Sequence, residues 1–287
     1  MKTAWTILTD AIGNFIADDG WALASHIAMS ALIAIFPFLI FLTALAGFLG
    51  SKELAESAVQ ILFDTWPADV ARPIAREVHD VLTQSRGGLL TLGVVLSLYF
   101  ASTGVEALRT GLNRAYALRD PRVWWVLRLQ SIFLVFVGAV ALLIYAFLLV
   151  LGPLLWEIAV RDLPALEPLA RLVTIARFAV TLATLGIALV ILHRWLPCRR
   201  YSYRQIAPGI VLTLVFSAGF GELFGIYLSK FATNYVSTYA GLASVMIALA
   251  FLYAVASIFL LGGELNASLL RHANREAHAV TADLTPR

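Results

Sequence analysis

The chain of 287 residues has a single cysteine, Cys198, and only 14% of its residues are charged. One thiol excludes a disulfide-stapled secreted scaffold, which needs several cysteines to stabilise a small core. Disordered chains combine low hydrophobicity with high net charge, so this composition excludes them as well. No sustained heptad of apolar residues occurs, which excludes a coiled coil.

The sequence also lacks the short motifs that mark common catalytic and nucleotide-binding sites. It contains no P-loop, no Gly-rich dinucleotide-binding turn and no GxSxG nucleophile elbow. Its five histidines show no metal-ligand spacing, and His193 with Cys198 supplies only half of a metal site. We therefore expect a protein that is not an enzyme, with no cofactor and no metal. An acyl or headgroup transfer site assembled from distant residues stays open as an alternative.

Hydrophobic residues, by contrast, make up 60% of the chain. A soluble core of this size cannot cover so much apolar surface, so the composition predicts an integral membrane protein. Six apolar stretches reach the roughly 20 residues that a helix needs to cross the bilayer. They lie at about 21–49, 89–108, 123–151, 174–196, 206–229 and 239–263. The predicted fold class is all-α, a polytopic bundle of six transmembrane helices in one domain over residues 1–272.

Arginines are concentrated in two of the short connections. Residues 109–128 contain five arginines, and residues 193–205 contain four without any acidic residue. Residues 51–88 and 152–177 instead balance or exceed their basic residues with acidic ones. Cytoplasmic loops carry the excess of Lys and Arg, so this pattern predicts that both termini, including a tail at 273–287, are cytoplasmic. The first twenty residues do not read as a signal peptide, so the first span is expected to be an uncleaved anchor.

The long connection at 51–88 has apolar residues at helical spacing. It predicts two short amphipathic helices, broken at Trp66-Pro67, that lie on or cap the outer face of the bundle. A solvated helical hairpin with its apolar side packed on the bundle fits the pattern equally well.

Pro37 lies in the middle of the first span. Proline removes a backbone donor and clashes with the preceding turn, so a break near mid-membrane is expected there. The proline is then either a tolerated kink or a functional hinge.

Small residues recur every four positions in three of the spans, which typically marks close helix–helix contact. These stripes are Gly93, Ser97 and Ala101; Ser217, Gly221, Gly225 and Ser229; and Ala240, Ser244 and Ala248. For Gly221 and Gly225, a contact within the chain is preferred over a dimer seam.

Ionisable and amide side chains within the spans are costly in lipid and should face a partner or water. Six of them share the inner level and are expected to converge on one polar pocket: His26, Glu106, Arg109, Asn113, Glu264 and Asn266. Glu106 and Arg109 lie three residues apart and are expected to pair directly. Glu222 is the deepest candidate and forms an outer group. These residues constitute either a charged-substrate site or polar contacts that tie helix ends together.

The arginines at 199, 200 and 204 are interleaved with Tyr201 and Tyr203. In a soluble protein this pattern favours nucleic-acid binding. In a membrane protein, the usual excess of basic residues in cytoplasmic loops explains these arginines without nucleic-acid binding. Anionic lipid headgroups are the nearer partner, and nucleic acid is not expected.

A series of short motifs carries a resemblance to a known family. The motifs are Gly88-Leu89-Leu90-Thr91-Leu92-Gly93 leading to Ala107-Leu108-Arg109-Thr110-Gly111-Leu112-Asn113-Arg114-Ala115-Tyr116, Arg194-Trp195-Leu196-Pro197 with Ala207-Pro208-Gly209, Tyr239-Ala240-Gly241-Leu242-Ala243 and Leu261-Gly262-Gly263-Glu264-Leu265-Asn266-Ala267. In this order they resemble the YihY/BrkB family of bacterial inner-membrane proteins over about residues 21–272. The chain departs from the family at Tyr239-Ala240-Gly241, where the pattern usually reads Tyr-Gly-Ser.

The resemblance implies six transmembrane helices with cytoplasmic ends, in the bacterial inner membrane. Family members have carried the name ribonuclease BN, a label generally regarded as a misassignment. Others have been linked to virulence, serum resistance and export of envelope lipids. Because no carboxylate or histidine cluster in this sequence would hold a metal and activate water, ribonuclease activity is not expected.

Two functional hypotheses remain. The first is a transporter or lipid-handling protein without its own ATPase that moves or presents a phospholipid or glycolipid-type amphiphile, with membrane lipids as partners. Arg109 would meet an anionic headgroup, Glu106 would orient that arginine, and Glu222 and Glu264 would supply protonatable or polar contacts. The second is a non-transporting scaffold or regulator that binds an envelope protein through the 51–88 hairpin. The oligomeric state is not predicted.

Overall fold

The structure, a computed structural model, describes residues 2–48, 60, 90–162, 170–239 and 242–283, which form helices and short connections without a strand. The helices are α1 (Lys2–Ala17), α2 (Gly20–Phe48), α5 (Leu90–Ala115), α6 (Trp124–Asp162), α7 (Ala170–Trp195), α8 (Tyr203–Tyr239) and α9 (Leu242–Asp283). The predicted all-α class is confirmed. The predicted hairpin at 51–88 lies outside the described residues, apart from Gln60.

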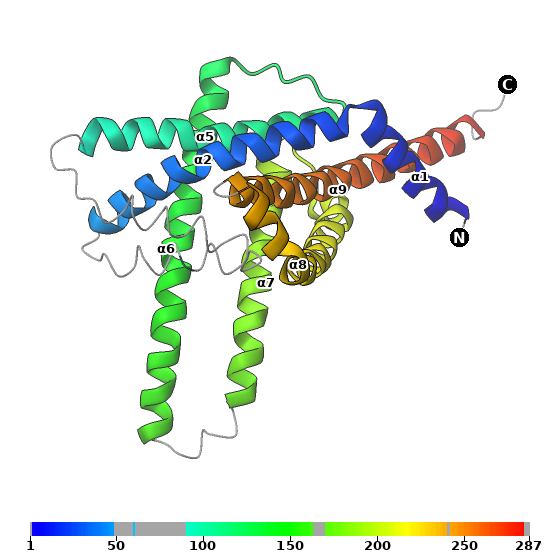
Figure 1. The fold of residues 1–287 in the computed structure, drawn as a ribbon. Coiled ribbons are helices and arrows are strands. Elements are labelled where there is room, and N and C mark those ends of the chain that lie inside the picture. Colours follow the sequence, from blue (N-terminus) through cyan, green and yellow to red (C-terminus); the bar gives the residue numbers. More distant parts are fainter. Residues whose placement is uncertain (1, 49–59, 61–89, 163–169, 240–241, 284–287) are drawn as a thin grey trace.

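Helices α2, α5 and α9 run in a similar direction and pack along one another (Figure 1), with α8 against α9. Helices α6 and α7 cross this group and extend away from it. Helix α1 packs on the C-terminal half of α9, so the first and last helices of the chain lie side by side.

Each predicted span coincides with or lies largely within one of these helices, and most of the helices are longer than the spans. Four contain apolar stretches long enough to cross a membrane, at Gly20–Leu42, Trp124–Tyr145, Tyr203–Lys230 and Val245–Arg275. Helix α7 contributes a shorter apolar stretch, Ala179–Trp195. Within the described part of the chain, the protein is thus a polytopic helical membrane protein, but the predicted count of six spans is not confirmed.

Helix α2 continues through Pro37 without interruption. The predicted break is therefore wrong. Leu39 and Leu42, within the following turn and a half, are fully buried against neighbouring helices, and such packing holds a proline-containing membrane helix together. A hinge at this proline stays a prediction.

Helix α1 is an amphipathic helix that precedes the first predicted span and was not predicted from the sequence. Ala11 and Phe15 are buried, and Asn14 donates to the Ser268 hydroxyl on α9 at 3.4 Å. The adjacent face exposes apolar side chains at helical spacing, namely Trp5, Leu8, Ile12 and Ile16. A helix with one apolar face exposed beside a membrane-spanning group is typical of an interfacial helix.

Helices α8 and α9 approach each other closely at two glycines. A Cβ added to Gly209 would clash with the backbone oxygen of Gly262, and one added to Gly262 would clash with Thr213 and Gly209, so neither position has room for a side chain. The small-residue stripes behave differently: Ala101 and Ala248 are buried, whereas a Cβ on Gly93 or Gly221 would meet nothing within 4 Å. No packing contact for Gly221 is thus present among the described residues, and the contact of the Gly221–Gly225 pair within the chain stays a prediction.

Candidate functional site

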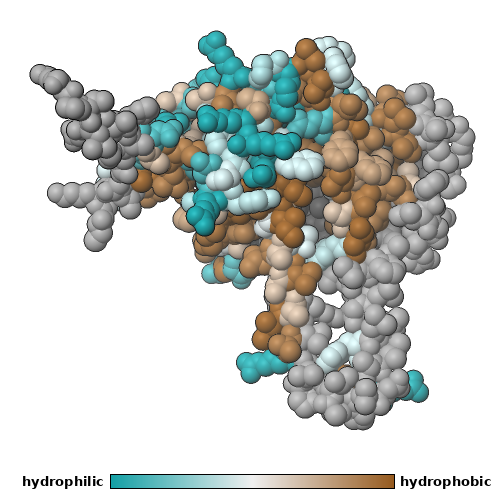
Figure 2. Space-filling model, turned by 180° about the vertical axis from the view of Figure 1, so that it is seen from behind, coloured by the Kyte–Doolittle hydropathy of each residue, from teal (hydrophilic) through white to brown (hydrophobic). Residues whose placement is uncertain are grey.

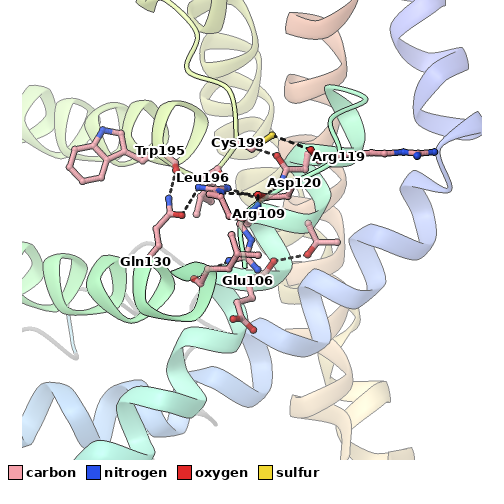
Figure 3. Close-up of polar contacts among 12 residues, drawn as sticks. Glu106, Arg109, Arg119, Asp120, Gln130, Trp195, Leu196 and Cys198 are labelled. Carbon is pink, nitrogen blue, oxygen red and sulfur yellow. Dashed lines mark hydrogen bonds and ion pairs between the residues drawn. The ribbon is translucent and has the colours of Figure 1, made fainter. Parts of the chain in front are cut away.

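Most of the polar side chains that make contacts gather at one end of the bundle. We call this region the basic end and define it by the α1–α2 junction at 18–19, the connections 116–123 and 196–202, and the helix ends that these join. Figure 3 shows side chains from α5, α6 and both connections meeting there.

Asp120, in the 116–123 connection, is the centre of one hydrogen-bond network. Its carboxylate accepts from Arg122 Nε at 2.8 Å and Nη2 at 2.6 Å, and from Asn113 Nδ2 at 3.1 Å. The Arg122 guanidinium holds the pKa of Asp120 below its ordinary value, and Asp120 in turn raises the pKa of Arg122. Both groups therefore stay charged over the physiological range.

The same network fixes the second connection onto the first. Arg122 Nη2 also donates to the Leu196 carbonyl at 3.0 Å, and the Cys198 backbone N–H donates to Asn113 Oδ1 at 3.1 Å. Gln130 of α6 donates to the carbonyl of Trp195. Through these bonds the ends of α5, α6 and α7 hold one another in place (Figure 3).

Arg109 and Glu106, predicted to pair, have different partners. Arg128 of α6 lies 3.0 Å from Glu106, and its guanidinium also donates to Ser102 and lies 3.8 Å from the centre of the Tyr99 ring. Arg109 Nη1 donates to the Leu127 carbonyl at 3.1 Å and to the Ser131 hydroxyl at 3.3 Å. The predicted direct pair is wrong because a cation from the facing helix occupies the carboxylate.

A cavity of about 550 Å³ lies beside this network. Its lining comes from the α1–α2 junction, the end of α5, the following connection and α6: Asp18, Asp19, Ala22, Leu23, Arg109, Thr110, Asn113, Arg114, Leu118, Asp120 and Leu127. Its volume is within the range of small-molecule sites. Arg109 is buried, at 8% exposure, and lines the cavity, whereas Arg114 is exposed and pairs with Asp18 at 3.4 Å.

Asn266 on α9 is the centre of a second network. Its Oδ1 accepts from the Gly209 N–H at 2.7 Å, and its Nδ2 donates to the Ile206 carbonyl at 3.1 Å and to the Tyr116 hydroxyl at 3.2 Å. Tyr116 stacks on Tyr201 with ring centres 4.5 Å apart, and burial raises its pKa. Asn266 thus ties α9 to the start of α8 and to the end of α5.

Glu264 is buried two residues before this asparagine. The described residues provide its carboxylate with one cation, Arg271, whose Nη2 lies 3.6 Å from Oε2. Oε2 has no hydrogen bond within the part of the chain that the structure describes. A buried, weakly paired carboxylate in a membrane helix is a candidate for proton exchange.

The structure therefore separates the predicted inner pocket into three parts. Arg109 and Asn113 line the cavity, Glu264 and Asn266 lie on α9 outside its lining, and Glu106 pairs with Arg128. His26 is exposed on α2 and does not line the cavity, and Glu222 is exposed on α8. Asn266 thus ties helix ends together and Arg109 lines a cavity, whereas a charged-substrate site stays a prediction.

Three residues of the network were not singled out in the sequence: Arg122 and Arg128 were counted only as charges, and Asp120 was not considered. The signal that would have found Asp120 and Arg122 is Asp120-Pro121-Arg122, because aspartate before proline typically begins a turn and can bind the next arginine. The role of Arg128 has no local signal, since its partners lie on another helix.

Exposed tryptophans and one tyrosine surround the basic end. They stand at the starts of α2, α6 and α8 and at the end of α7: Trp21, Trp124, Trp125, Trp195 and Tyr203, with Trp124 the most exposed at 76%. Tryptophan and tyrosine concentrate at the level of lipid headgroups. Figure 2 shows hydrophilic residues gathered in one area of the surface with hydrophobic residues beside it.

Among the described residues, no group of three or more His, Cys, Asp or Glu side chains is placed to hold a metal ion. The network at the basic end instead consists of arginine–carboxylate, amide and backbone contacts. Such groups bind and position polar ligands.

Comparison with known proteins places the chain among bacterial membrane proteins. The profile of a family described as Virulence factor BrkB matches residues 11–284. A ribonuclease-like protein of Bacillus subtilis, YfkH, is 27% identical over 92% of this chain and 95% of its own length. A UPF0761 membrane protein of Rhodospirillum centenum is 26% identical over 92% of this chain, and one of Pseudomonas aeruginosa is 26% identical over 89%.

The UPF0761 relatives are longer, since the matched part is 57% of the Rhodospirillum protein and 61% of the Pseudomonas protein. No solved structure matches the chain. The family match covers nearly all of the sequence and agrees with the motifs around Arg109, Gly209 and Asn266. This chain is a member of the BrkB family of membrane proteins.

Proposed function

We propose that the protein is a lipid-handling protein or transporter without its own ATPase, which moves or presents a phospholipid or glycolipid-type amphiphile. The observation that carries this proposal is the cavity at the basic end, where the buried Arg109 lines a space at the level of the exposed tryptophans. A headgroup in this cavity would leave its acyl chains beside the apolar helices. Lipid is therefore the expected partner.

Arg109 is suited to an anionic group because only part of its guanidinium is used. Its Nη1 makes two hydrogen bonds within the protein, whereas Nε and Nη2 have no acceptor among the described residues. A guanidinium fixed at one nitrogen presents the remaining N–H groups in a defined direction, which favours a phosphate or carboxylate. Glu106 acts indirectly, by holding Arg128 beside Tyr99 and Ser102.

Movement of a charged headgroup across the bilayer requires further polar contacts along the path. Glu264 supplies a buried carboxylate near the cavity end, and Glu222 supplies an exposed one on α8. In this proposal both act as protonatable contacts, with energy from an ion gradient or from the lipid's own gradient. His26, which is exposed on α2, supplies a polar contact at the membrane surface.

We further propose that the protein resides in the bacterial inner membrane with the basic end facing the cytoplasm. The concentration of arginines at this end supports that orientation. The packing of α1 on α9 supports two termini on the same side.

The test is lipid movement in proteoliposomes that contain the full chain, followed with a fluorescent phospholipid and a membrane-impermeant quencher. Arg109→Gln is expected to slow movement at least tenfold, and Arg109→Lys to slow it less, because lysine keeps the charge without the planar fork. Arg275→Gln, at an exposed arginine of α9, is the matched control and is expected to match the wild type. Equal rates for the wild type, Arg109→Gln and Arg109→Lys, in preparations of equal thermal stability, would contradict the proposal.

The scaffold hypothesis depends on residues 51–88, which lie outside the described residues. It predicts that Ile74 and Val78 matter for a partner's co-purification and that Arg109 does not. The Arg109 variants therefore separate the two hypotheses.

A further inference from the structure

The charges that line the cavity are largely paired within the protein. Asp18 pairs with Arg114 at 3.4 Å, and Asp120 accepts two hydrogen bonds from the Arg122 guanidinium. Of the five charged lining residues, this leaves one carboxylate, Asp19, and one guanidinium, Arg109, without an ionic partner among the described residues. The cavity thus offers one negative and one positive group to a ligand.

Asp19 is held at the cavity by the turn between α1 and α2. Its φ of 57° is in the left-handed region, its N–H donates to the Ile16 carbonyl at 3.3 Å, and its carbonyl accepts from the Leu23 N–H at 3.0 Å. These backbone bonds fix the position of the residue, while its side chain is exposed. The fold therefore positions the Asp19 carboxylate through its backbone, and the carboxylate itself has no ionic partner among the described residues.

The rest of the lining indicates what kind of cation fits beside Asp19. None of the described lining residues is aromatic, whereas quaternary ammonium groups are recognised by aromatic cages. A primary ammonium group instead donates hydrogen bonds, which a carboxylate accepts. Ala22, Leu23, Leu118 and Leu127 supply apolar walls for the carbon atoms that join the charged groups.

We propose that the cavity recognises a zwitterionic headgroup that carries a phosphate and a primary ammonium group, as in phosphatidylethanolamine. Arg109 binds the phosphate, and Asp19 binds the ammonium. This inference rests on the proposed function, because it names the lipid class for the same cavity. It adds Asp19 as the residue that determines headgroup specificity.

The test is native mass spectrometry of the full chain with an equimolar mixture of phosphatidylethanolamine, phosphatidylcholine and phosphatidylglycerol of matched acyl chains. The wild type is expected to retain phosphatidylethanolamine preferentially. Asp19→Asn is expected to reduce that preference up to about fivefold without reducing total lipid, since an exposed ion pair contributes at most about this factor. Asparagine also tolerates the left-handed backbone, so the variant keeps the turn.

Asp10→Asn is the matched control, because Asp10 lies on α1 before this turn, pairs with His272 and does not line the cavity. It is expected to keep the wild-type preference. Free O-phosphoethanolamine is added as a competitor, and displacement of the phospholipid by it supports recognition of the headgroup itself.

Three other outcomes are informative. Equal retention of the three lipids, or a preference unchanged in Asp19→Asn, overturns the headgroup assignment and leaves the lipid-handling function standing. Retention of none of the lipids overturns the proposed function. Binding of O-phosphoethanolamine without any phospholipid supports the two-charge site and shows that its ligand is soluble.

Discussion

The basic end and the exposed face of α8 at 215–227 both contain glycines and acidic residues. The surroundings of these residues differ between the two regions. Gly209 near the start of α8 touches Gly262 of α9, whereas a Cβ on Gly221, three turns later, would meet nothing within 4 Å. Asp120 at the basic end accepts hydrogen bonds from Arg122 and Asn113, whereas Glu222 on α8 is exposed. Glycine spacing and acidic residues in a membrane helix therefore do not by themselves identify a contact or a site.

The difference lies in the neighbours that the fold supplies. At the basic end, the α1–α2 junction, the two connections and the six helix ends that they join bring donors and acceptors within hydrogen-bond distance, and each bond limits the freedom of the next. Along 215–227, Val215, Phe216 and Leu223 are exposed, as expected of a surface that faces lipid or another chain. Rigid polar contacts at one end and an apolar surface along the helices suit a protein that binds headgroups at one level of the bilayer.

Alanine at the two glycines of α8 is expected to give the largest contrast. Gly209→Ala places a methyl group against the backbone of Gly262, which forces α8 from α9 and is expected to cost about 3 kcal/mol. Gly221→Ala fills open space and is expected to be neutral or stabilising by up to about 1 kcal/mol. Thermal unfolding in detergent measures both. Equal losses for the two variants would show that the α8–α9 contact is not at Gly209.

Removal of the Asn266 side chain is expected to have the next largest effect. Asn266→Ala leaves the buried Gly209 N–H, the Ile206 carbonyl and the Tyr116 hydroxyl without this partner, at an expected cost of about 2–3 kcal/mol. Asn274→Ala, at an exposed asparagine of the same helix, is the control and is expected to change stability little. The same unfolding measurement compares the two variants. An unchanged stability of Asn266→Ala would show that the hydrogen bonds of Asn266 do not stabilise the protein.

Asp120→Asn tests the ionic network and is expected to cost about 1–2 kcal/mol, because two hydrogen bonds to Arg122 lose their charge assistance. The effect depends on pH. The pKa of Asp120 is lowered in the folded protein, so its contribution is complete above the ordinary carboxyl pKa and is lost as the pH falls through the lowered value.

The stability difference between the wild type and Asp120→Asn is therefore expected to be constant from about pH 5 to 8 and to shrink below about pH 4. Denaturant unfolding at each pH measures it. A difference that grows with acid would assign the opposite shift to this carboxyl group.

Glu222→Gln is expected to have the smallest effect, within about 0.5 kcal/mol, because the side chain is exposed. Under the proposed function this variant slows lipid movement while lipid binding at the basic end is unchanged. The flipping assay and native mass spectrometry separate the two quantities. A large loss of stability would show that Glu222 has a partner.

The sequence was sufficient for the helices whose signal is local. The start of α2 follows from a long apolar run directly after Asp18-Asp19, and the helix covers all the described residues of the predicted span 21–49. Helix α1 was not predicted, because a membrane span or a signal peptide needs a continuous apolar run. The apolar residues of α1 are instead separated by polar ones.

The site could be predicted only in part, because its partners are distant in the chain. Asn266 was singled out by its depth, but its bonds reach Gly209 and Tyr116, separated from it by 57 and 150 residues. Helical spacing predicted a Glu106–Arg109 pair because it describes neighbours within one helix only. The actual partner of Glu106, Arg128, lies on a different helix. Arg109 itself was identified correctly as a residue of the polar end, and its headgroup role stays a prediction.

The most direct test of the central account is photocrosslinking of a phospholipid with a photoreactive group near its headgroup, followed by peptide mapping. A headgroup site at the basic end predicts crosslinks concentrated in residues 18–23 and 109–127, which contain the cavity lining, and their loss when unlabelled phospholipid is added in excess. Crosslinks spread evenly over the apolar helices, or concentrated at 215–227 of α8, would contradict a headgroup site at the basic end.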